Sequence, residues 1–189
     1  MYSRLTSKPS VLFALSVTVL VAACGHATAG PALKAVVVEQ APVIDGDLSD
    51  ACWQSVPAVT EFCYVDTGSP AAEPTTAWLA YDSENVYVAF DCKDSQPDKI
   101  VAQQTKRGGD VWRDDNVTAY FDLFSEYRGD RFSYFTVTAG GTQAHEVRSA
   151  QTVKTEWAGD WDAAAKRNPD GYSVEMRIPF SILLSLIHI

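Results

Sequence analysis

The sequence predicts an all-β fold, an antiparallel β-sandwich, on three observations. Three segments alternate between two sets of side chains, one of them apolar, with the period of two expected of a strand that buries one face. Clusters of Gly, Pro, Asn, Asp and Ser separate the alternating segments, as turns do between short strands. No stretch sustains the apolar period of a helix, so a fold of many short strands follows.

Residues 1–23 are predicted to be a secretory signal. Arg4 and Lys8 precede an apolar run at 11–23, and small residues follow it. This is the order of charge, apolar segment and cleavage site in a signal, and so short a run does not span a bilayer. We therefore expect an exported protein.

Cys24 is predicted to carry a lipid. The run Val21-Ala22-Ala23-Cys24 resembles a bacterial lipobox, in which the cysteine is diacylated and becomes the new N-terminus. Residues 24–37 would form a tether, and Gly25 stands where an Asp would favour the inner membrane, so we expect the outer membrane or cell surface. The alternative is cleavage at Ala27-Thr28-Ala29 without a lipid, which would leave the protein periplasmic or secreted.

Residues 38–183 are predicted to form the sandwich. Its one expected helical turn lies at 47–53, with Asp47 as the cap and Trp53 filling the core beneath it. The alternating segments lie at 86–92, 117–123 and 172–178, and the turns at 82–85, 127–130, 140–141 and 168–171.

Two further tryptophans are assigned by their phase along a strand. Trp161 is in phase with Ala163 and Ala165 and is expected in the core. Trp78 is out of phase with Leu79, so it is expected on the other face of its strand, in contact with a partner or under a further part of the protein.

The last six residues, 184–189, are predicted to be foreign to the natural protein. The codons CTG TCT CTT ATA CAC ATC would encode Leu184 to Ile189, and that string resembles the mosaic end of a transposase used to prepare sequencing libraries. We therefore expect the natural chain to continue beyond Leu183, with a C-terminal domain that this sequence lacks.

The charge argues against a nucleic-acid partner. The chain has 24 acidic and 15 basic residues, a net charge of −9, and it lacks the clustered Lys and Arg that neutralise phosphates. Neutral or cationic partners remain.

Three cysteines follow the tether, namely Cys52, Cys63 and Cys92. They are an odd number of thiols in an oxidising compartment, so they form at most one disulfide or lie buried as small apolar side chains.

A catalytic constellation is missing from the sequence. His145 is the one histidine between the tether and residue 184, and no Gly-x-Ser-x-Gly motif is present. Asp114 and Asp115 are neighbours that point apart on entering a strand, whereas glycoside hydrolysis needs two facing carboxylates. We expect this part of the chain to be non-catalytic.

Five motifs in order resemble the family 9 carbohydrate-binding modules. They are PVIDGDLSDACW at 42–53, WLAYD at 78–82, NVYVAF at 85–90, WRDDNVTAYFD at 112–122 and GYSVEMRIP at 171–179. The resemblance covers residues 38–181. It implies a β-sandwich of the family 9 type that binds an oligosaccharide or polysaccharide without catalysis.

The stretch SQPDKIV at 95–101 resembles one branch of that family. In this branch the module stands at the N-terminus of longer bacterial cell-envelope proteins. Two functions follow. One is a carbohydrate-binding module of an exported envelope protein within a glycan-degrading system, whose complete form could be a glycoside hydrolase. The alternative is a structural or partner-binding domain at the front of a larger outer-membrane protein, without sugar binding.

The resemblance also places a sugar-binding slot at Trp112. In sugar-binding members a Trp just before the Asp-x-Val strand forms one wall of the slot, and an indole face suits the apolar C–H face of a pyranose. The alternative is that Trp112 folds back as a lid over the edge of the sandwich. Candidate ligand contacts are Trp112, Arg113, Asp115 and Thr118, with Trp78 and Trp157 as secondary candidates.

Two positions depart from the sugar-binding pattern. Where those members carry a Glu and an Arg in the slot, this sequence has Thr118 and Thr136. The resemblance therefore implies hydrogen bonding that is altered, weakened or lost.

The aspartates admit a structural calcium ion, since relatives in the family hold calcium through carboxylates and carbonyls. The candidate sets are Asp110, Asp114 and Asp115, or Asp91, Asp94 and Asp98, with solvated surface charge as the alternative.

The same fold houses haem in electron-transfer proteins, for which His145 and Met176 are the available axial pair. Met176, however, is in phase with core residues, and we expect no cofactor beyond a possible calcium ion.

Overall fold

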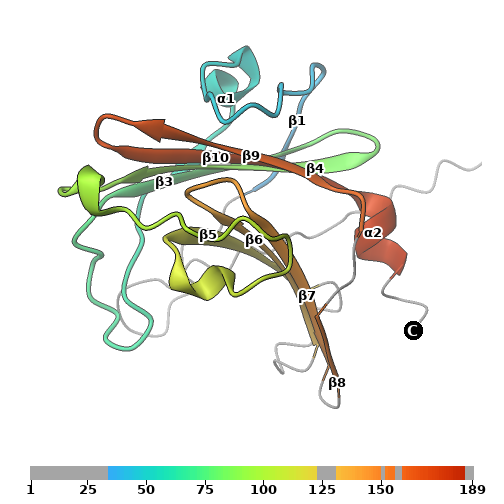
Figure 1. Cartoon of the computed structure of the whole chain (residues 1–189). Coiled ribbons are helices and arrows are strands. Elements are labelled where there is room, and N and C mark those ends of the chain that lie inside the picture. Colours follow the sequence, from blue (N-terminus) through green and yellow to red (C-terminus); the bar gives the residue numbers. More distant parts are fainter. Residues whose placement is uncertain (1–33, 123–130, 150–151, 156–158, 186–189) are drawn as a thin grey trace, which may run out of the picture.

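The computed structural model describes residues 34–122, 131–149, 152–155 and 159–185, which form two β-sheets packed face to face (Figure 1). A six-stranded sheet has the order β1-β3-β4-β10-β9, with β2 beside β3, and a four-stranded sheet has the order β5-β6-β7-β8. All pairings are antiparallel except that of β1 with β3. The prediction of an antiparallel β-sandwich is confirmed.

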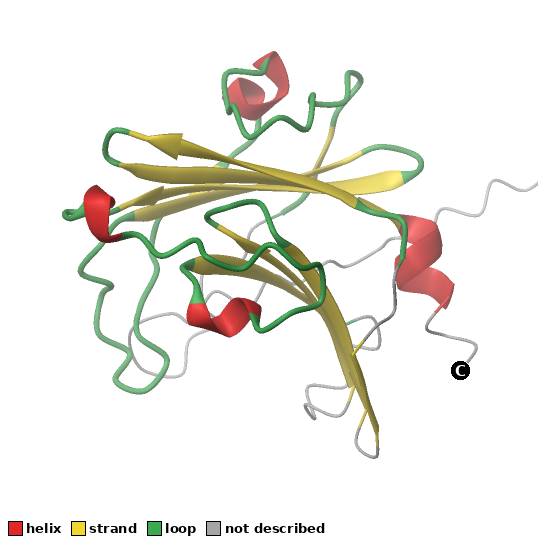
Figure 2. Cartoon of the chain, in the orientation of Figure 1, coloured by secondary structure: helices red, strands yellow, loops and turns green. Residues whose placement is uncertain are grey.

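The strands are short and the helices few (Figure 2). The strands are β1 (Val36–Val37), β2 (Ala58–Val59), β3 (Thr75–Tyr81), β4 (Asn85–Lys93), β5 (Asn116–Phe121), β6 (Arg131–Thr138), β7 (Gln143–Ser149), β8 (Thr152–Thr155), β9 (Asp162–Asn168) and β10 (Gly171–Pro179). The helices are α1 (Ala51–Ser55), α2 (Phe180–Ser185) and the 3-10 turns η1 (Pro97–Lys99) and η2 (Val111–Arg113).

The main core lies between the two sheets and includes the side chains that the alternation predicted. On β4 these are Val86, Val88, Phe90 and Cys92, on β5 Val117, Ala119 and Phe121, and on β10 Tyr172, Val174, Met176 and Ile178. Trp161 is buried in the same core, edge-on to Phe135 with ring centroids 5.2 Å apart, as its phase predicted. Residue 123, the last of the second alternating segment, lies outside the described residues.

The six-stranded sheet is buried on both faces, which the sequence did not predict. Figure 1 shows α1 and the chain before it lying on the face that points away from the four-stranded sheet. A second cluster fills this layer, with Trp53 and Val56 of the α1 region packed on Tyr87 and Ala89 of β4. The prediction of one buried face is therefore wrong for β4 and β10, because a segment distant in sequence covers their outer side.

Glu175 of β10 holds that covering segment in place. Its carboxylate is fully buried and accepts hydrogen bonds from Trp53 Nε1 at 2.7 Å, the Gly46 amide at 2.8 Å and the Asp45 amide at 3.1 Å. Burial raises the pKa of the Glu175 carboxyl above its ordinary value, and the three N–H donors oppose that rise. Gly46 has a φ of +84°, and a Cβ there would lie 2.8 Å from the backbone of Ala165, so the close approach requires glycine.

The helical predictions need two corrections. The helix begins at Ala51 with Asp50 at the N-cap position, so Asp47 lies too far ahead of it to cap it. The Asp47 carboxylate instead accepts from the Ser49 amide at 3.1 Å and pairs with Lys166 of β9 at 2.6 Å. The second helix, α2, was not predicted, and it adds Ile182 and Leu183 to the main core. None of the helices within the described residues combines the length and the apolar character that crossing a membrane requires.

The other local predictions have mixed outcomes. The turns at 82–85, 140–141 and 168–171 connect β3 to β4, β6 to β7 and β9 to β10, while the one at 127–130 lies outside the described residues. Cys52, Cys63 and Cys92 form no disulfide with one another. Cys92 is buried, and the other two are partly buried.

Candidate functional site

Trp112 lies on η2, immediately before β5, with its side chain turned outward. The residue is 55% exposed, whereas the preceding Val111 is 1% exposed and fills the position beneath. Consecutive residues of a tight turn point in different directions, so only one of two adjacent apolar side chains reaches the interior. Trp112 is therefore not a lid over the core but an aromatic surface open to solvent.

Hydrogen bonds to the chain segment that precedes it hold the Trp112 turn. Asp114 is buried and accepts from the Gln104 amide at 2.7 Å, while Asp115 is exposed and accepts from the Val101 amide at 2.7 Å. The side-chain amide of Asn116 donates through Nδ2 to the Asp114 backbone carbonyl at 2.8 Å. These contacts fix the backbone around Trp112, so the indole is presented by an ordered support.

A row of hydroxyl and amide groups continues from the turn across the outer face of β5 and β6. Thr118 and Thr136 are paired in register, and their hydroxyl oxygens are 2.9 Å apart. The Thr118 hydroxyl is also 3.5 Å from the side-chain oxygen of Asn116. The two threonines, at the positions where the resemblance implies a Glu and an Arg, therefore share a hydrogen bond. Thr118 remains partly exposed and Thr136 is buried.

Beyond the threonines, an aromatic group covers the same outer face. Tyr120 is 46% exposed and stands edge-on to Tyr134 at a centroid distance of 4.7 Å, and Phe132 lies 5.0 Å from Tyr134. This aromatic group was not predicted from the sequence, although Tyr120 alternates out of phase with the core residues of its strand. On this outer face Trp112, Thr118 and Tyr120 reach solvent from η2 and β5, whereas Tyr134 and Thr136 of β6 are buried.

The model of the carbohydrate family 9 binding domain-like family matches residues 44–187. The chain belongs to this family. Family 9 domains of this kind bind carbohydrate and are non-catalytic, which confirms that this part of the chain is not an enzyme. No curated protein matches the sequence.

Solved structures support the family 9 fold. A crystal structure of a protein from Bacteroides uniformis aligns with a TM-score of 0.59 at 14% identity, over 81% of this chain and 73% of that one. A family 9 module from Caldicellulosiruptor kristjanssonii in complex with cellotriose has a TM-score of 0.51 and 23% identity, over 77% of this chain and 66% of that one. A family 9 module from the same organism in complex with glucose has a TM-score of 0.51 and 21% identity, over 76% of this chain and 67% of that one.

The other predicted site residues are distributed unequally over the family 9 domain. Arg113 is next to Trp112 on the turn, and its guanidinium pairs with Asp110 at 2.6 Å. Trp78 is on β3, on the outer face of the opposite sheet, so it does not share a slot with Trp112. Trp157 and Cys24 lie outside the described residues.

The residues considered for cofactors have structural roles in the family 9 domain. Among the described residues, no group of three or more His, Cys, Asp or Glu side chains is arranged to hold a metal ion, and calcium binding stays a prediction. Met176 is fully buried in the main core. His145 stacks on Phe135 with centroids 4.2 Å apart.

Proposed function

We propose that this family 9 domain binds a neutral oligosaccharide or polysaccharide through Trp112 and the adjoining outer face of β5, where Thr118 and Tyr120 reach solvent. The observation that carries the proposal is that Trp112 is exposed while the turn bearing it is anchored by buried Val111 and by the Asp114 and Asp115 hydrogen bonds. An ordered, exposed indole offers a stacking surface at little conformational cost.

The surroundings of Trp112 favour a sugar over other ligands. Hydroxyl and amide groups of Thr118 and Asn116 lie within the same face, where they match the ring-edge hydroxyls of a pyranose. The net charge of −9 disfavours acidic polymers. Since related modules have been crystallised with cellotriose and glucose, β-glucans are the first ligands to test.

Stacking on Trp112 would contribute a large share of the binding energy, because Thr118 and Thr136 are uncharged. We expect soluble oligosaccharides to quench tryptophan fluorescence with a dissociation constant in the micromolar to millimolar range, about −8 to −4 kcal/mol. In isothermal titration calorimetry, which does not depend on the Trp112 fluorophore, Trp112→Ala is expected to weaken binding by roughly 1 to 3 kcal/mol. Because the ring is largely exposed, the free energy of unfolding should change by less than about 1 kcal/mol.

Two matched variants complete the experiment. Trp112→Phe keeps an aromatic face and should retain most of the affinity, whereas Val65→Ala removes an exposed apolar side chain from another loop and should change nothing. A folded Trp112→Ala protein that binds a broad glycan panel as tightly as the wild type would refute the Trp112 site. A wild type that binds no glycan of the panel would favour the structural envelope role.

We further propose that the protein is exported and anchored by a lipid on Cys24, as part of a glycan-degrading system at the outer membrane or cell surface. The proposal is supported by the signal-like residues 1–23 and the lipobox-like run before Cys24. Wild-type protein should enter the detergent phase on phase separation, and Cys24→Ala should not. Soluble wild-type protein that begins at Gly30 would instead establish cleavage after Ala29.

A further inference from the structure

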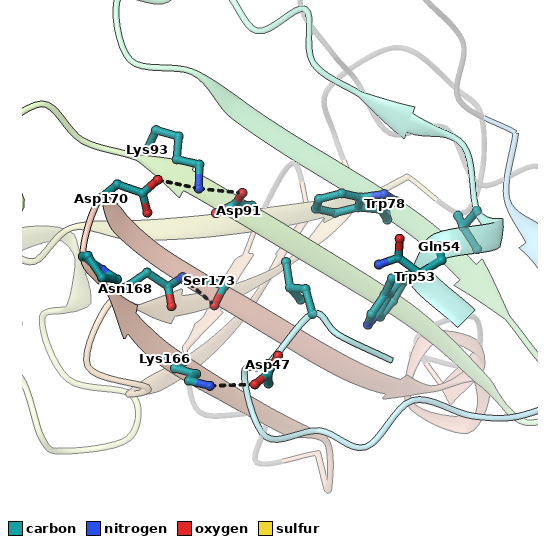
Figure 3. Close-up of a pocket in the computed structure, with 13 residues that line it drawn as sticks. Asp47, Trp53, Gln54, Trp78, Asp91, Lys93, Lys166, Asn168, Asp170 and Ser173 are labelled. Atoms are coloured by element: carbon teal, nitrogen blue, oxygen red, sulfur yellow. Dashed lines mark hydrogen bonds and ion pairs between the residues drawn. The ribbon is translucent and has the colours of Figure 1, made fainter. Parts of the chain in front are cut away.

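A second surface with the properties of a ligand site lies on the outer face of the six-stranded sheet. It is a cleft of about 610 Å³, within the size range of small-molecule sites, bounded by the α1 segment and by the β9–β10 turn. Figure 3 shows Trp78 and Gln54 at one end of the cleft, and Lys93, Asp170 and Asn168 at the other. The segment α1 lies on the face of the six-stranded sheet that points away from β5 and β6. This cleft and the Trp112 surface are therefore on opposite sides of the sandwich (Figure 1).

The floor of the cleft is a polar row that crosses neighbouring strands. Asp91 of β4 is in register with Ser173 of β10, and Ser173 is in register with Lys166 of β9. One step further along the strands the outer face becomes the buried layer of Ala89 and Glu175 beneath α1. Ser173 is itself buried and donates to the Gly46 carbonyl at 2.6 Å, so the open part of the floor lies at partly exposed Asp91 and exposed Lys166.

Trp78 supplies the one partly exposed aromatic ring in the described lining. It packs by one side against the second core cluster and remains partly exposed beside the polar floor. Trp53 also borders the cleft, but it is buried and its N–H is bonded to Glu175. A ligand with an apolar face and a polar edge could stack on Trp78 and reach the polar floor.

The charges in the cleft are paired with one another. The Lys93 ammonium lies 3.1 Å from the Asp91 carboxylate and 2.9 Å from that of Asp170, and Lys166 lies 2.6 Å from Asp47. Three carboxylates and two ammonium groups leave a formal charge of −1. The paired charges offer donors and acceptors to a ligand without creating the positive field that an anionic ligand needs.

We propose that this cleft is a second carbohydrate-binding site, which takes a neutral oligosaccharide segment with one pyranose face on Trp78 and its hydroxyls on the Lys93–Asp170 and Lys166–Asp47 pairs. The site shares the ligand class of the proposed function but none of its residues. With sites on opposite faces, one domain would contact two glycan chains, and binding to a polysaccharide would gain avidity that short oligosaccharides do not show.

Indole N–H signals in NMR test the proposal, since each of the five tryptophans gives its own resonance and Trp78→Phe and Trp112→Ala assign the two that matter. The full chain is titrated with cellotriose, laminaritriose, xylotriose and mannotriose to about 20 mM, above the range of weak sugar binding. The acidic trisaccharide trigalacturonate serves as the charge control. We expect at least one neutral trisaccharide to shift the Trp78 signal saturably, both in the wild type and in Trp112→Ala.

Rim variants keep the test independent of folding, since Trp78 is partly buried. Asp170→Asn removes a carboxylate from an exposed turn and should weaken binding at Trp78 roughly three- to tenfold, with unfolding unchanged. Asp98→Asn, on exposed η1, is the matched control and should leave the affinity unaltered.

The outcomes separate the two sites. A Trp112 signal that responds while Trp78 stays fixed overturns the cleft proposal alone, and a response of Trp78 alone overturns the Trp112 site instead. Loss of the Trp78 response in Trp112→Ala would indicate one shared site and would overturn the cleft proposal. A stronger response to trigalacturonate than to every neutral sugar would overturn the ligand class, and no response of either ring would overturn both sites.

Discussion

Glu175→Gln is the substitution whose effect on folding the structure defines most closely. The carboxylate satisfies three N–H donors with two oxygens, and the glutamine amide retains one oxygen. In its better orientation that oxygen faces the Gly46 and Asp45 amides, which leaves the glutamine NH₂ opposed to Trp53 Nε1–H. One buried donor without an acceptor costs about 1 to 3 kcal/mol, and the two remaining bonds lose their charge assistance. We therefore expect a loss of roughly 2 to 4 kcal/mol.

Chemical and thermal unfolding monitored by circular dichroism measure this loss. For a domain of this size, roughly 2 to 4 kcal/mol corresponds to a fall in Tm of about 5 to 15 °C. Glu61→Gln, the same change at an exposed position, should leave Tm within about 1 °C. In the Glu175→Gln background, Trp53→Phe should cost less than it does in the wild type, because the substitution removes the opposed N–H.

The acid dependence of stability provides a second observable for Glu175. Because the folded pKa is raised above its ordinary value of 4.5, the native state binds this proton more tightly than the unfolded state does. The associated stability is fully present below the unfolded pKa and is lost as pH rises through the folded pKa. As pH rises from the unfolded to the folded pKa of Glu175, the wild type loses this stability and Glu175→Gln does not. The difference in unfolding free energy between the two proteins should therefore narrow as pH rises through that range. A Glu175→Gln protein within about 0.5 kcal/mol of wild type would refute the anchoring role.

Three other outcomes can be checked with single variants or reagents. Gly171→Ala should destabilise the domain by at least about 3 kcal/mol in urea unfolding, because its φ is +149° and a Cβ would lie 1.9 Å from the Cys92 carbonyl oxygen. Gly68→Ala, with positive φ but open space, should cost only about 1 kcal/mol, and equal losses would contradict the steric argument. Burial raises the pKa of the Cys92 thiol to about 11, so a thiol reagent near neutral pH should modify it only after unfolding, and rapid labelling of the native protein would contradict its burial. Burial and the Asp82 carboxylate raise the pKa of Tyr87 to about 12, so Asp82→Asn should lower it in a spectrophotometric titration, and an unchanged value would exclude the 2.6 Å contact.

The sequence by itself determined the features that depend on neighbours along the chain. Strict alternation placed Val174 and Met176 inside the sandwich, since successive side chains of a strand must point to opposite faces. Turn residues located the β3–β4 and β9–β10 connections for equally local reasons. In the first turn the Asp82 carboxylate accepts from the Glu84 and Asn85 amides, and in the second Pro169 and Gly171 permit the backbone conformation. The ordered motifs also indicated the family.

The tertiary structure decided whatever depends on contacts between distant residues. Asp47 fits the local rule for a helix cap, but the helix begins only at Ala51, and one oxygen of the Asp47 carboxylate pairs with Lys166, 119 residues later. The second buried layer exists because Glu175 binds the Gly46 amide across 129 residues. A pattern of period two cannot show that a helix from elsewhere covers the outer face of a strand.

The same distinction applies to the two proposed sites. Val111 and Trp112 are adjacent apolar residues, and only the packing beneath the η2 turn selects which of them is exposed. The cleft at Trp78 joins residues of β3, β4, β9 and β10 with the α1 segment, so no window of the sequence contains it. Sequence periodicity fixes the direction of a side chain within its own strand, whereas a binding surface also requires the positions of other strands, which are set by long-range packing and hydrogen bonding.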